Sequence, residues 1–81
     1  MGIDHKIIPN PNKGLFRLQL ESGPNGQMVI EIYNISGQKI ATRTFDGSNF
    51  DFNISEQPRG TYIYKILDQS GRHGYGRLIL I

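Results

Sequence analysis

The sequence predicts an all-β fold, and three observations lead to this prediction. Apolar and polar residues alternate in short stretches, as they do in strands with one buried face. Clusters of Gly, Pro and Asn separate these stretches at intervals of about ten residues, a spacing typical of β-sandwiches. No stretch keeps the helical spacing of apolar residues for three turns. We therefore expect seven short strands, which their short connections make antiparallel.

The first two predicted strands are residues 6–8 and 15–21. Between them, Pro9 and Pro11 lack the amide that a β-ladder needs, so the chain turns there. The second strand alternates cleanly, and its apolar face carries Phe16, Leu18 and Leu20. Residues 22–26, Ser-Gly-Pro-Asn-Gly, then predict a second turn.

The middle of the chain predicts a hairpin followed by a fifth strand. Residues 27–35 and 38–45 form the hairpin, and Ser36 and Gly37 form its tight turn because glycine adopts a positive φ without steric cost. After a turn at residues 46–49, the fifth strand covers residues 50–54. Its apolar residues again alternate with polar ones.

The last two predicted strands are residues 61–67 and 75–81, with residues 68–74 as the loop between them. Together these elements predict a seven-stranded antiparallel β-sandwich of the immunoglobulin-like type. Met28 is expected to point inward, and most of the core is expected to come from ten residues: Phe16, Leu18, Leu20, Ile30, Ile32, Ile40, Phe52, Tyr62, Tyr64 and Ile66.

Size and composition limit the classes of function. A chain of 81 residues makes one domain at most. Its net charge of +2 is scattered without a basic run, which argues against nucleic-acid binding. The absence of cysteine excludes disulfides, thiolate metal ligands and thiol nucleophiles. We expect residues 1–5 to be an expression start or a linker from a preceding passenger, and residues 6–81 to be the domain.

Residues with catalytic or metal-binding potential lack the partners that such chemistry needs. His5 and His73 are expected to be solvated, in a frayed terminus and a polar loop. No serine lies in a Gly-x-Ser-x-Gly motif, and the loop beginning at Asp46 lacks the closing Glu of a calcium site. The glycines of residues 71–76 predict a flexible loop, since no helix follows them. We therefore expect no enzyme activity, no metal and no cofactor.

Four segments, in order along the chain, resemble the signature of a known family. They are Pro-Asn-Pro-Asn-Lys-Gly-Leu-Phe at residues 9–16, residues 32–40, residues 58–66, and the basic-then-aliphatic residues 77–81. The resemblance is to the C-terminal sorting domains of the type IX secretion system (type A, the Por secretion tail family), and it covers residues 7–81. Two details differ from the family pattern: Thr61 replaces an aliphatic residue, and no lysine follows Ile81.

The resemblance implies a sorting signal that directs a passenger protein across the outer membrane. It implies a Bacteroidetes source, passage through the periplasm, and a final location at the cell surface or outside the cell. The implied partners are the type IX translocon, an outer-membrane shuttle protein, and a sortase-like cysteine protease that removes the domain. The implied motif residues are Pro9, Asn10, Pro11, Gly14, Phe16, Gly37, Gly60, Tyr62, Lys65, Arg77, Leu78, Ile79, Leu80 and Ile81.

The last strand is the expected docking element, because an unpaired edge strand offers backbone hydrogen bonds to a partner strand. The same property predicts edge-to-edge homodimers through this strand. Two alternatives remain open from the residues alone. One is an adhesive or carbohydrate-binding sandwich that uses aromatic residues such as Tyr62 and Tyr64, and the other is a passive immunoglobulin-like spacer within a longer surface protein.

Overall fold

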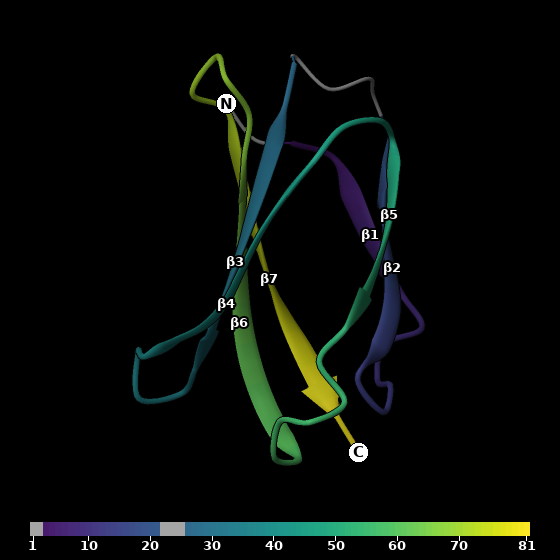
Figure 1. The fold of residues 1–81 in the computed structure, drawn as a ribbon, viewed down its shortest axis with the longest axis vertical. Helices are drawn as coiled ribbons and strands as arrows, with labels where there is room; N and C mark the ends of the chain where they lie inside the picture. The colour runs from purple at the N-terminus through teal and green to yellow at the C-terminus, as the bar shows by residue number, and fades with distance from the viewer. Residues whose placement is uncertain (1–2, 22–25) are drawn as a thin grey trace.

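The computed structural model describes residues 3–21 and 26–81, and it confirms an all-β sandwich. Two antiparallel sheets face each other, and the described residues contain no helix (Figure 1). Each strand lies within two residues of its predicted position at either end. The strands are β1 (His5–Ile8), β2 (Leu15–Leu20), β3 (Met28–Asn34), β4 (Lys39–Phe45), β5 (Asn49–Asn53), β6 (Gly60–Leu67) and β7 (His73–Leu80).

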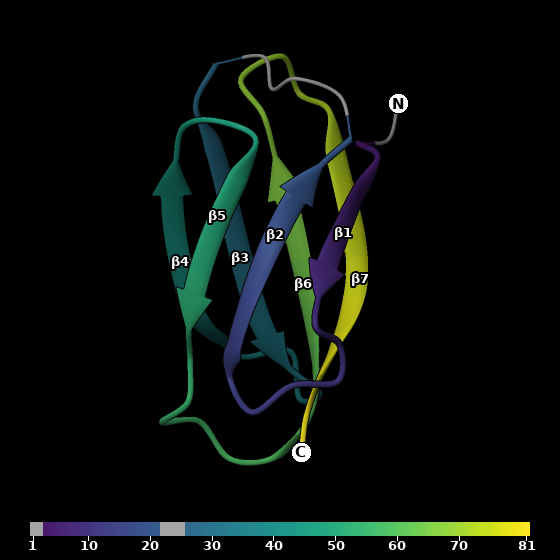
Figure 2. The ribbon, with the colours of Figure 1, turned by 90° about the vertical axis from the view of Figure 1, so that its right-hand side faces the viewer.

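The smaller sheet has the strand order β1-β2-β5, and the larger has the order β4-β3-β6-β7. In the sandwich, β1 lies over β7 and β5 lies over β4 (Figure 2). A hydrogen bond from the amide of Ile3 to the carbonyl of His73 ties the sheets together beside β1. The last strand is therefore an edge strand, as predicted, and β4 is the opposite edge of the same sheet.

The core lies between the sheets and is built from alternate residues of each strand. All predicted core residues except Ile40 are buried. Phe16 stacks on Phe52, with ring centroids 5.1 Å apart, and Phe45 joins the same aromatic cluster at the edge of Phe52. The buried apolar residues are Ile3, Ile7, Phe16, Leu18, Leu20, Met28, Ile30, Ile32, Phe45, Phe52, Ile54, Tyr62, Tyr64, Ile66, Leu78 and Leu80.

The prediction that Ile40 belongs to the core is wrong, because a β-bulge changes the register of its strand. Ile32 pairs with Ala41, but the next residue, Tyr33, pairs with Lys39. Ile40 is the extra residue between these two pairs, so it is only partly buried and packs against the margin of the core. Strict alternation read from the sequence cannot detect such an insertion.

The β6–β7 connection is shorter and more ordered than predicted. The predicted loop reached residue 74, whereas β7 already begins at His73. Asp68 orders the turn, since its carboxylate accepts hydrogen bonds from the amides of Ser70 and Arg72, at 2.9 and 3.0 Å. The turn predicted at residues 22–26 lies, apart from Gly26, outside the described residues, whereas the Gly37 turn is confirmed with φ of +86°.

The chain segment before residue 6 takes part in the fold. Ile3 is buried in the core, and His5 is the first residue of β1. A division of the chain after residue 5 stays a prediction, but the side chains of residues 3 and 5 pack with the sandwich that follows them.

Candidate functional site

The first family segment lies along the free edge of β7 and covers the carboxyl half of that strand. The side chain of Asn10 donates to the carbonyl of Arg77 at 2.8 Å and accepts from the amide of Ile79 at 3.1 Å. The amide of Asn12 donates to the carbonyl of Ile79 at 2.9 Å, and the carbonyl of Asn12 accepts from the amide of Ile81 at 2.8 Å. We call residues 9–14 the clasp, because they take the place of a neighbouring strand.

Asn12 holds the clasp in shape. Its side chain is buried, donates to the carbonyl of Pro9 at 2.8 Å and accepts from the amide of Gly14 at 2.8 Å. Gly14 has a φ of +103° and lies so close to the β5–β6 loop that a Cβ there would be 2.5 Å from the Cα of Ser55. Both the backbone conformation and the space therefore require glycine. Asn12 belongs to the first family segment, but it is not among the motif residues predicted from the sequence.

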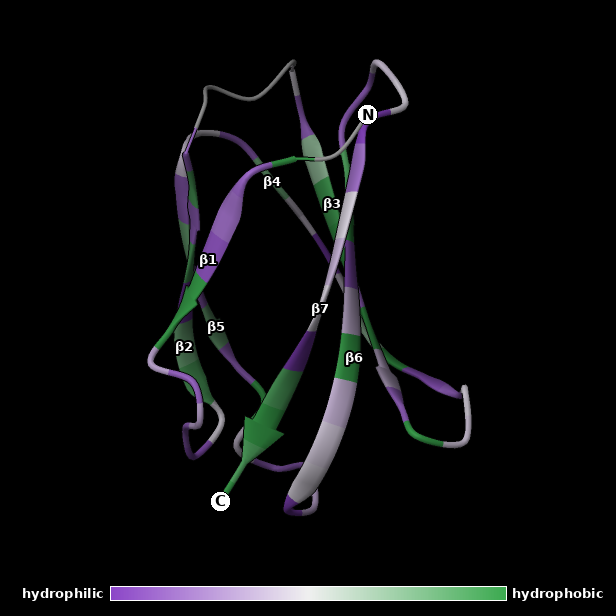
Figure 3. Cartoon of the chain, turned by 180° about the vertical axis from the view of Figure 1, so that it is seen from behind, coloured by the Kyte–Doolittle hydropathy of each residue, from purple (hydrophilic) through white to green (hydrophobic). Residues whose placement is uncertain are grey.

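The covered half of β7 is the most apolar part of the strand, which changes from hydrophilic to hydrophobic towards its end (Figure 3). Leu78 and Leu80 point into the core, at 0% and 4% exposure. Without the clasp, the edge of this segment would present open amides and carbonyls beside apolar side chains, a combination that favours unwanted strand pairing. The clasp therefore protects the edge that is most prone to aggregation.

The third family segment lies on the other side of β7. Gly60 pairs with Leu80, and Tyr62 pairs with Leu78 in the β6–β7 ladder. Tyr62 is buried, and its hydroxyl donates to the carbonyl of Pro58. Since Tyr62 and Tyr64 are both buried, neither ring is available to stack on a sugar. The structure thus brings the first, third and fourth segments together at one end of the sandwich.

The second family segment contributes a turn at this same end. Gly37 occupies the β3–β4 turn, with no atom within 4 Å of where a Cβ would lie. Residues of this turn and of the β5–β6 loop line an open hollow of about 500 Å³, among them Asn34, Gln38, Arg59 and Gly60. Within the described residues, Gly37 forms no hydrogen bond with the clasp. It shapes a turn rather than the covered edge.

Lys65 lies apart from the clasp, on the outer face of the larger sheet. It faces Tyr75 across the β6–β7 ladder, and its Nζ is 6.0 Å from the centre of that ring. Arg77 pairs with Ile63 on the same outer face. The two predicted basic motif residues are therefore neighbours on one surface, whereas Phe16, the aromatic residue of the first segment, is a core residue.

The prediction that both histidines are solvated is wrong for His5. Its Nδ1 lies 2.6 Å from the carbonyl of Ile3, and its Nε2 lies 2.7 Å from the hydroxyl of Tyr64. Because a carbonyl can only accept, Nδ1 carries the proton and Nε2 accepts from Tyr64. His73 is half-buried at the start of β7, and its ring packs edge-on against Tyr75 at 5.1 Å.

The glycines of β7 make room for this polar contact, so the prediction that residues 71–76 form a flexible loop is wrong from His73 onward. A Cβ on Gly76 would be 2.2 Å from the Tyr64 hydroxyl, and one on Gly74 would be 2.9 Å from the His5 ring. Burial raises the pKa of Tyr64, consistent with its role as a neutral donor. The sequence did carry a signal for this arrangement. Gly74 and Gly76 are two residues apart, as are residues on the same face of a strand.

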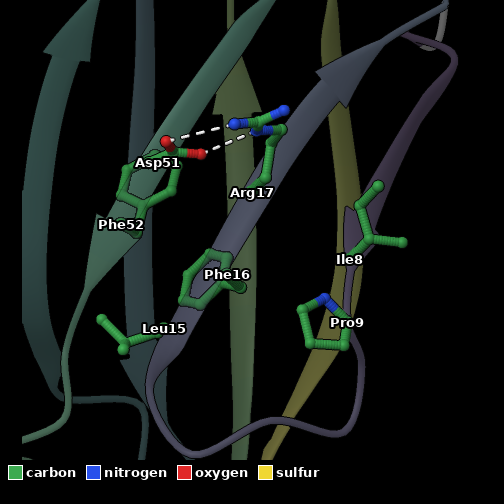
Figure 4. A pocket seen from close by; sticks show the side chains of 7 residues that line it. All are labelled: Ile8, Pro9, Leu15, Phe16, Arg17, Asp51 and Phe52. Carbon is green, nitrogen blue, oxygen red and sulfur yellow. Dashed lines mark hydrogen bonds and ion pairs between the residues drawn. The ribbon is translucent and has the colours of Figure 1, made fainter.

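A second hollow, of about 620 Å³, lies on the outside of the smaller sheet (Figure 4). Ile8, Pro9, Leu15 and Phe16 line it, where β1 ends and leaves β2 uncovered. Its polar rim is the pair of Arg17 and Asp51, with Nε 2.8 Å from Oδ1. The hydrogen bond from Arg17 lowers the pKa of Asp51. This pair is neutral overall and leaves no charge for catalysis or for an ionic ligand.

The described residues contain no group of three or more His, Asp or Glu side chains that could hold a metal ion. Among them there is also no helix that is long and apolar enough to cross a membrane. The arrangement offers backbone edges and side-chain surfaces for contact, rather than a set of acid, base and nucleophile.

Comparison with known proteins identifies the family of the chain. No curated protein matches the chain. The family model described as "Secretion system C-terminal sorting domain" matches residues 6–80, which include the clasp, the β3–β4 turn, β6 and all of β7. This family is not an enzyme family, and its members serve export towards the cell surface or the medium through contact with the secretion system. The chain belongs to the family of type IX secretion C-terminal sorting domains.

Proposed function

We propose that this domain brings a passenger protein to the outer membrane, where the type IX translocon and an outer-membrane shuttle protein recognise the fold. After transit through the periplasm and translocation, a sortase-like cysteine protease removes the domain. In this proposal residues 6–81 are the signal, and the preceding residues belong to the connection with the passenger.

The family match over residues 6–80 is the observation that carries this proposal. The geometry of the clasp adds to it. Asn10 and Asn12 hold the backbone of Arg77, Ile79 and Ile81, so the end of the chain has one fixed position. A receptor that must accept many passengers needs such a constant feature, and a rigid terminal strand supplies it at low entropic cost.

The proposed mode of recognition differs from the one expected from the sequence. Backbone pairing along residues 77–81 would first require release of Asn10 and Asn12, because their hydrogen bonds already occupy that edge. We therefore place recognition of residues 77–81 on the side chains that this clasped half displays, rather than on its backbone. A homodimer through this half of β7 meets the same obstacle, so the edge-to-edge homodimer expected from the sequence would require the clasp to open first.

The test is a reporter that carries its own inner-membrane signal and ends in residues 3–81, so that the buried Ile3 and the His5 of β1 are kept. In a type IX-competent cell we expect the reporter at the surface or in the medium, shortened by the mass of the domain after proteolysis. The matched controls are the same reporter without the domain and the same fusion in a cell that lacks the translocon. Reporter retained in the periplasm by all three strains would contradict the sorting role, and export at full length would contradict the cleavage step.

Removal of residues 77–81 is expected to stop export, but this variant also loses Leu78 and Leu80 from the core. Its failure would therefore report folding and recognition together. Substitutions that keep the core and change only the displayed surface separate the two effects.

A further inference from the structure

The outer face of β6 and β7 carries an exposed stripe of alternating apolar and basic residues. Across the ladder, Thr61 is opposite Ile79, Ile63 is opposite Arg77, and Lys65 is opposite Tyr75. Three of these side chains are large and apolar yet accessible, with exposures of 38% for Ile63, 58% for Tyr75 and 38% for Ile79. Adjacent exposed apolar side chains rimmed by charge are typical of interaction surfaces.

The whole charge excess of the chain lies on this face of the larger sheet. Three cations, Lys39, Lys65 and Arg77, stand there against one carboxylate, Glu31, which gives +2, equal to the formal net charge of the protein. Glu31 already accepts hydrogen bonds from Lys39 at 2.9 Å and from Tyr33 at 3.0 Å. Lys65 lies opposite Glu31 in the β3–β6 ladder. The hydrogen bond from Lys39 and, to a smaller extent, the charge of Lys65 lower the pKa of Glu31. Within the described residues, neither Lys65 nor Arg77 forms a direct ion pair, so both can contact a partner.

The outer face of the smaller sheet is different in charge. Lys6 lies 3.7 Å from Glu21, and Arg17 lies 2.8 Å from Asp51, so its cations are neutralised within the domain. Two chemically distinct surfaces therefore cover the same core. The β6–β7 surface combines unpaired positive charge with exposed aromatic and aliphatic groups, whereas the cations on the outer face of the smaller sheet are paired.

We propose that the surface formed by Ile63, Lys65, Tyr75, Arg77 and Ile79 binds an extended acidic segment of a protein partner. This proposal rests on the proposed sorting function for the identity of that partner, which is a component of the secretion machinery. Carboxylates of the segment pair with Lys65 and Arg77, while its apolar side chains cover Ile63, Tyr75 and Ile79.

Two features favour a protein segment over an anionic lipid or polysaccharide. Each of the two cations lies directly opposite an apolar side chain, Lys65 facing Tyr75 and Arg77 facing Ile63, whereas a polyanion is held best by a larger cluster of basic residues. In addition, the amide and carbonyl of Tyr75 point away from β6 by the alternation of the ladder, and no described residue bonds to them. The edge of β7 is therefore open at Tyr75, between the carbonyl of His73, which accepts from Ile3, and the carbonyl of Arg77, which accepts from Asn10. An extended partner chain can form hydrogen bonds there.

The direct test uses a synthetic peptide of about ten residues that alternates Glu and Val, titrated into the isotope-labelled domain and followed by NMR. We expect shifts of the resonances of Ile63, Lys65, Tyr75 and Arg77, and a loss of affinity as salt rises from about 50 to about 300 mM. A peptide of the same length that alternates Lys and Val should not bind. Vesicles containing phosphatidylglycerol form a separate arm, and binding to vesicles but not to the Glu-Val peptide would overturn the proposal in favour of a membrane surface.

The variant Lys65→Glu/Arg77→Glu is expected to weaken peptide binding by about tenfold or more. A small fall in melting temperature is expected as well, because the new carboxylate at position 65 faces Glu31 across the ladder, but the domain should stay folded at the temperature of the titration. The matched control is Arg43→Glu/Arg59→Glu, which makes the same change in net charge at two exposed cations that form no ion pair in the described residues and lie away from the stripe, and it should bind like the intact domain. Equal weakening by both variants would show a general charge effect and would overturn the proposed site.

The same variants in the reporter fusion separate this surface from the sorting role. Loss of export with Lys65→Glu/Arg77→Glu, but not with the control pair, supports recognition at this surface. Normal export by a folded Lys65→Glu/Arg77→Glu variant would overturn it while leaving the sorting function intact. If the unmodified fusion is itself not exported, the sorting function fails, and the peptide titration alone decides whether the surface binds acidic chains.

Discussion

The two edges of the larger sheet are protected in different ways. The edge at β7 ends in apolar residues and is covered by the clasp, which places Asn10 and Asn12 along its carboxyl half. The edge at β4 has no such cover, but its exposed residues are polar or charged, as in Thr42, Arg43 and Thr44. Charged and polar edges resist strand pairing without help, whereas apolar edges need to be blocked. The clasp therefore has a structural role at β7.

The largest difference between the two edges is expected when one glycine at each edge is replaced by alanine. Gly14→Ala in the clasp meets both a positive φ and the backbone of Ser55, so we expect a loss of stability of about 3 kcal/mol or more. Gly37→Ala, in the turn before β4, meets a positive φ but open space, and should cost about 1 kcal/mol. Urea unfolding of both variants measures the difference. Equal losses would mean that the clasp is no more tightly fitted than the hairpin turn.

A second substitution tests whether the clasp depends on the amide of Asn12. Asn12→Ala leaves the carbonyl of Pro9 and the amide of Gly14 without their partner in a buried place, and should cost about 1–3 kcal/mol. Asn53→Ala is the matched control, because Asn53 makes a similar local bond to the amide of Ser55, at 3.0 Å, but is exposed. Its cost should be below about 1 kcal/mol. Thermal denaturation of the pair gives the comparison, and a larger effect at Asn53 would contradict it.

The third prediction concerns acid and the turn that leads into β7. Burial would raise the pKa of Asp68, but hydrogen bonds from Ser70 and Arg72 outweigh it and lower this pKa from 3.8 to about 2. As the pH falls, Asp68 therefore takes up its proton at a higher pH in the unfolded chain than in the folded one. The stabilisation by Asp68 is complete above the pKa of the unfolded state and is lost as the pH falls through the pKa of the folded state. Asp68→Asn should lower the melting temperature at neutral pH, and the difference should shrink between about pH 4 and about pH 2. The exposed Asp46→Asn serves as the control, and a difference for Asp68→Asn that is independent of pH would contradict this account.

Most of the fold could be predicted from the sequence, because alternation along each strand is a local property. Leu18, Ile30 and Ile66 lie in the core as their spacing indicated. The contacts of the clasp could not be predicted in this way, since Asn10 bonds to residues 67 and 69 positions away. Sequence patterns show which residues are suited to a turn, but they do not show which distant backbone that turn will bind.

The same limit explains the other differences between prediction and structure. Gly74 and Gly76 look like loop residues until His5 and Tyr64 are found against them. Ile40 looks like a core residue until the bulge in β4 is known. In each case the position of the residue depends on a contact with another strand. Such a contact cannot be predicted from the neighbouring residues in the sequence.

Amide hydrogen exchange along β7, measured by NMR on the intact domain and on Asn10→Ala, tests the central claim most directly. The amides of Ile79 and Ile81 are bound by the clasp, whereas that of Tyr75 points out of the same strand without a bond. We therefore expect slow exchange at Ile79 and Ile81 and fast exchange at Tyr75. In Asn10→Ala, exchange at Ile79 should accelerate by about tenfold while Leu78, bonded to β6, is unchanged. Fast exchange at Ile79 in the intact domain, or no effect of Asn10→Ala, would contradict the claim that residues 9–14 close the last strand.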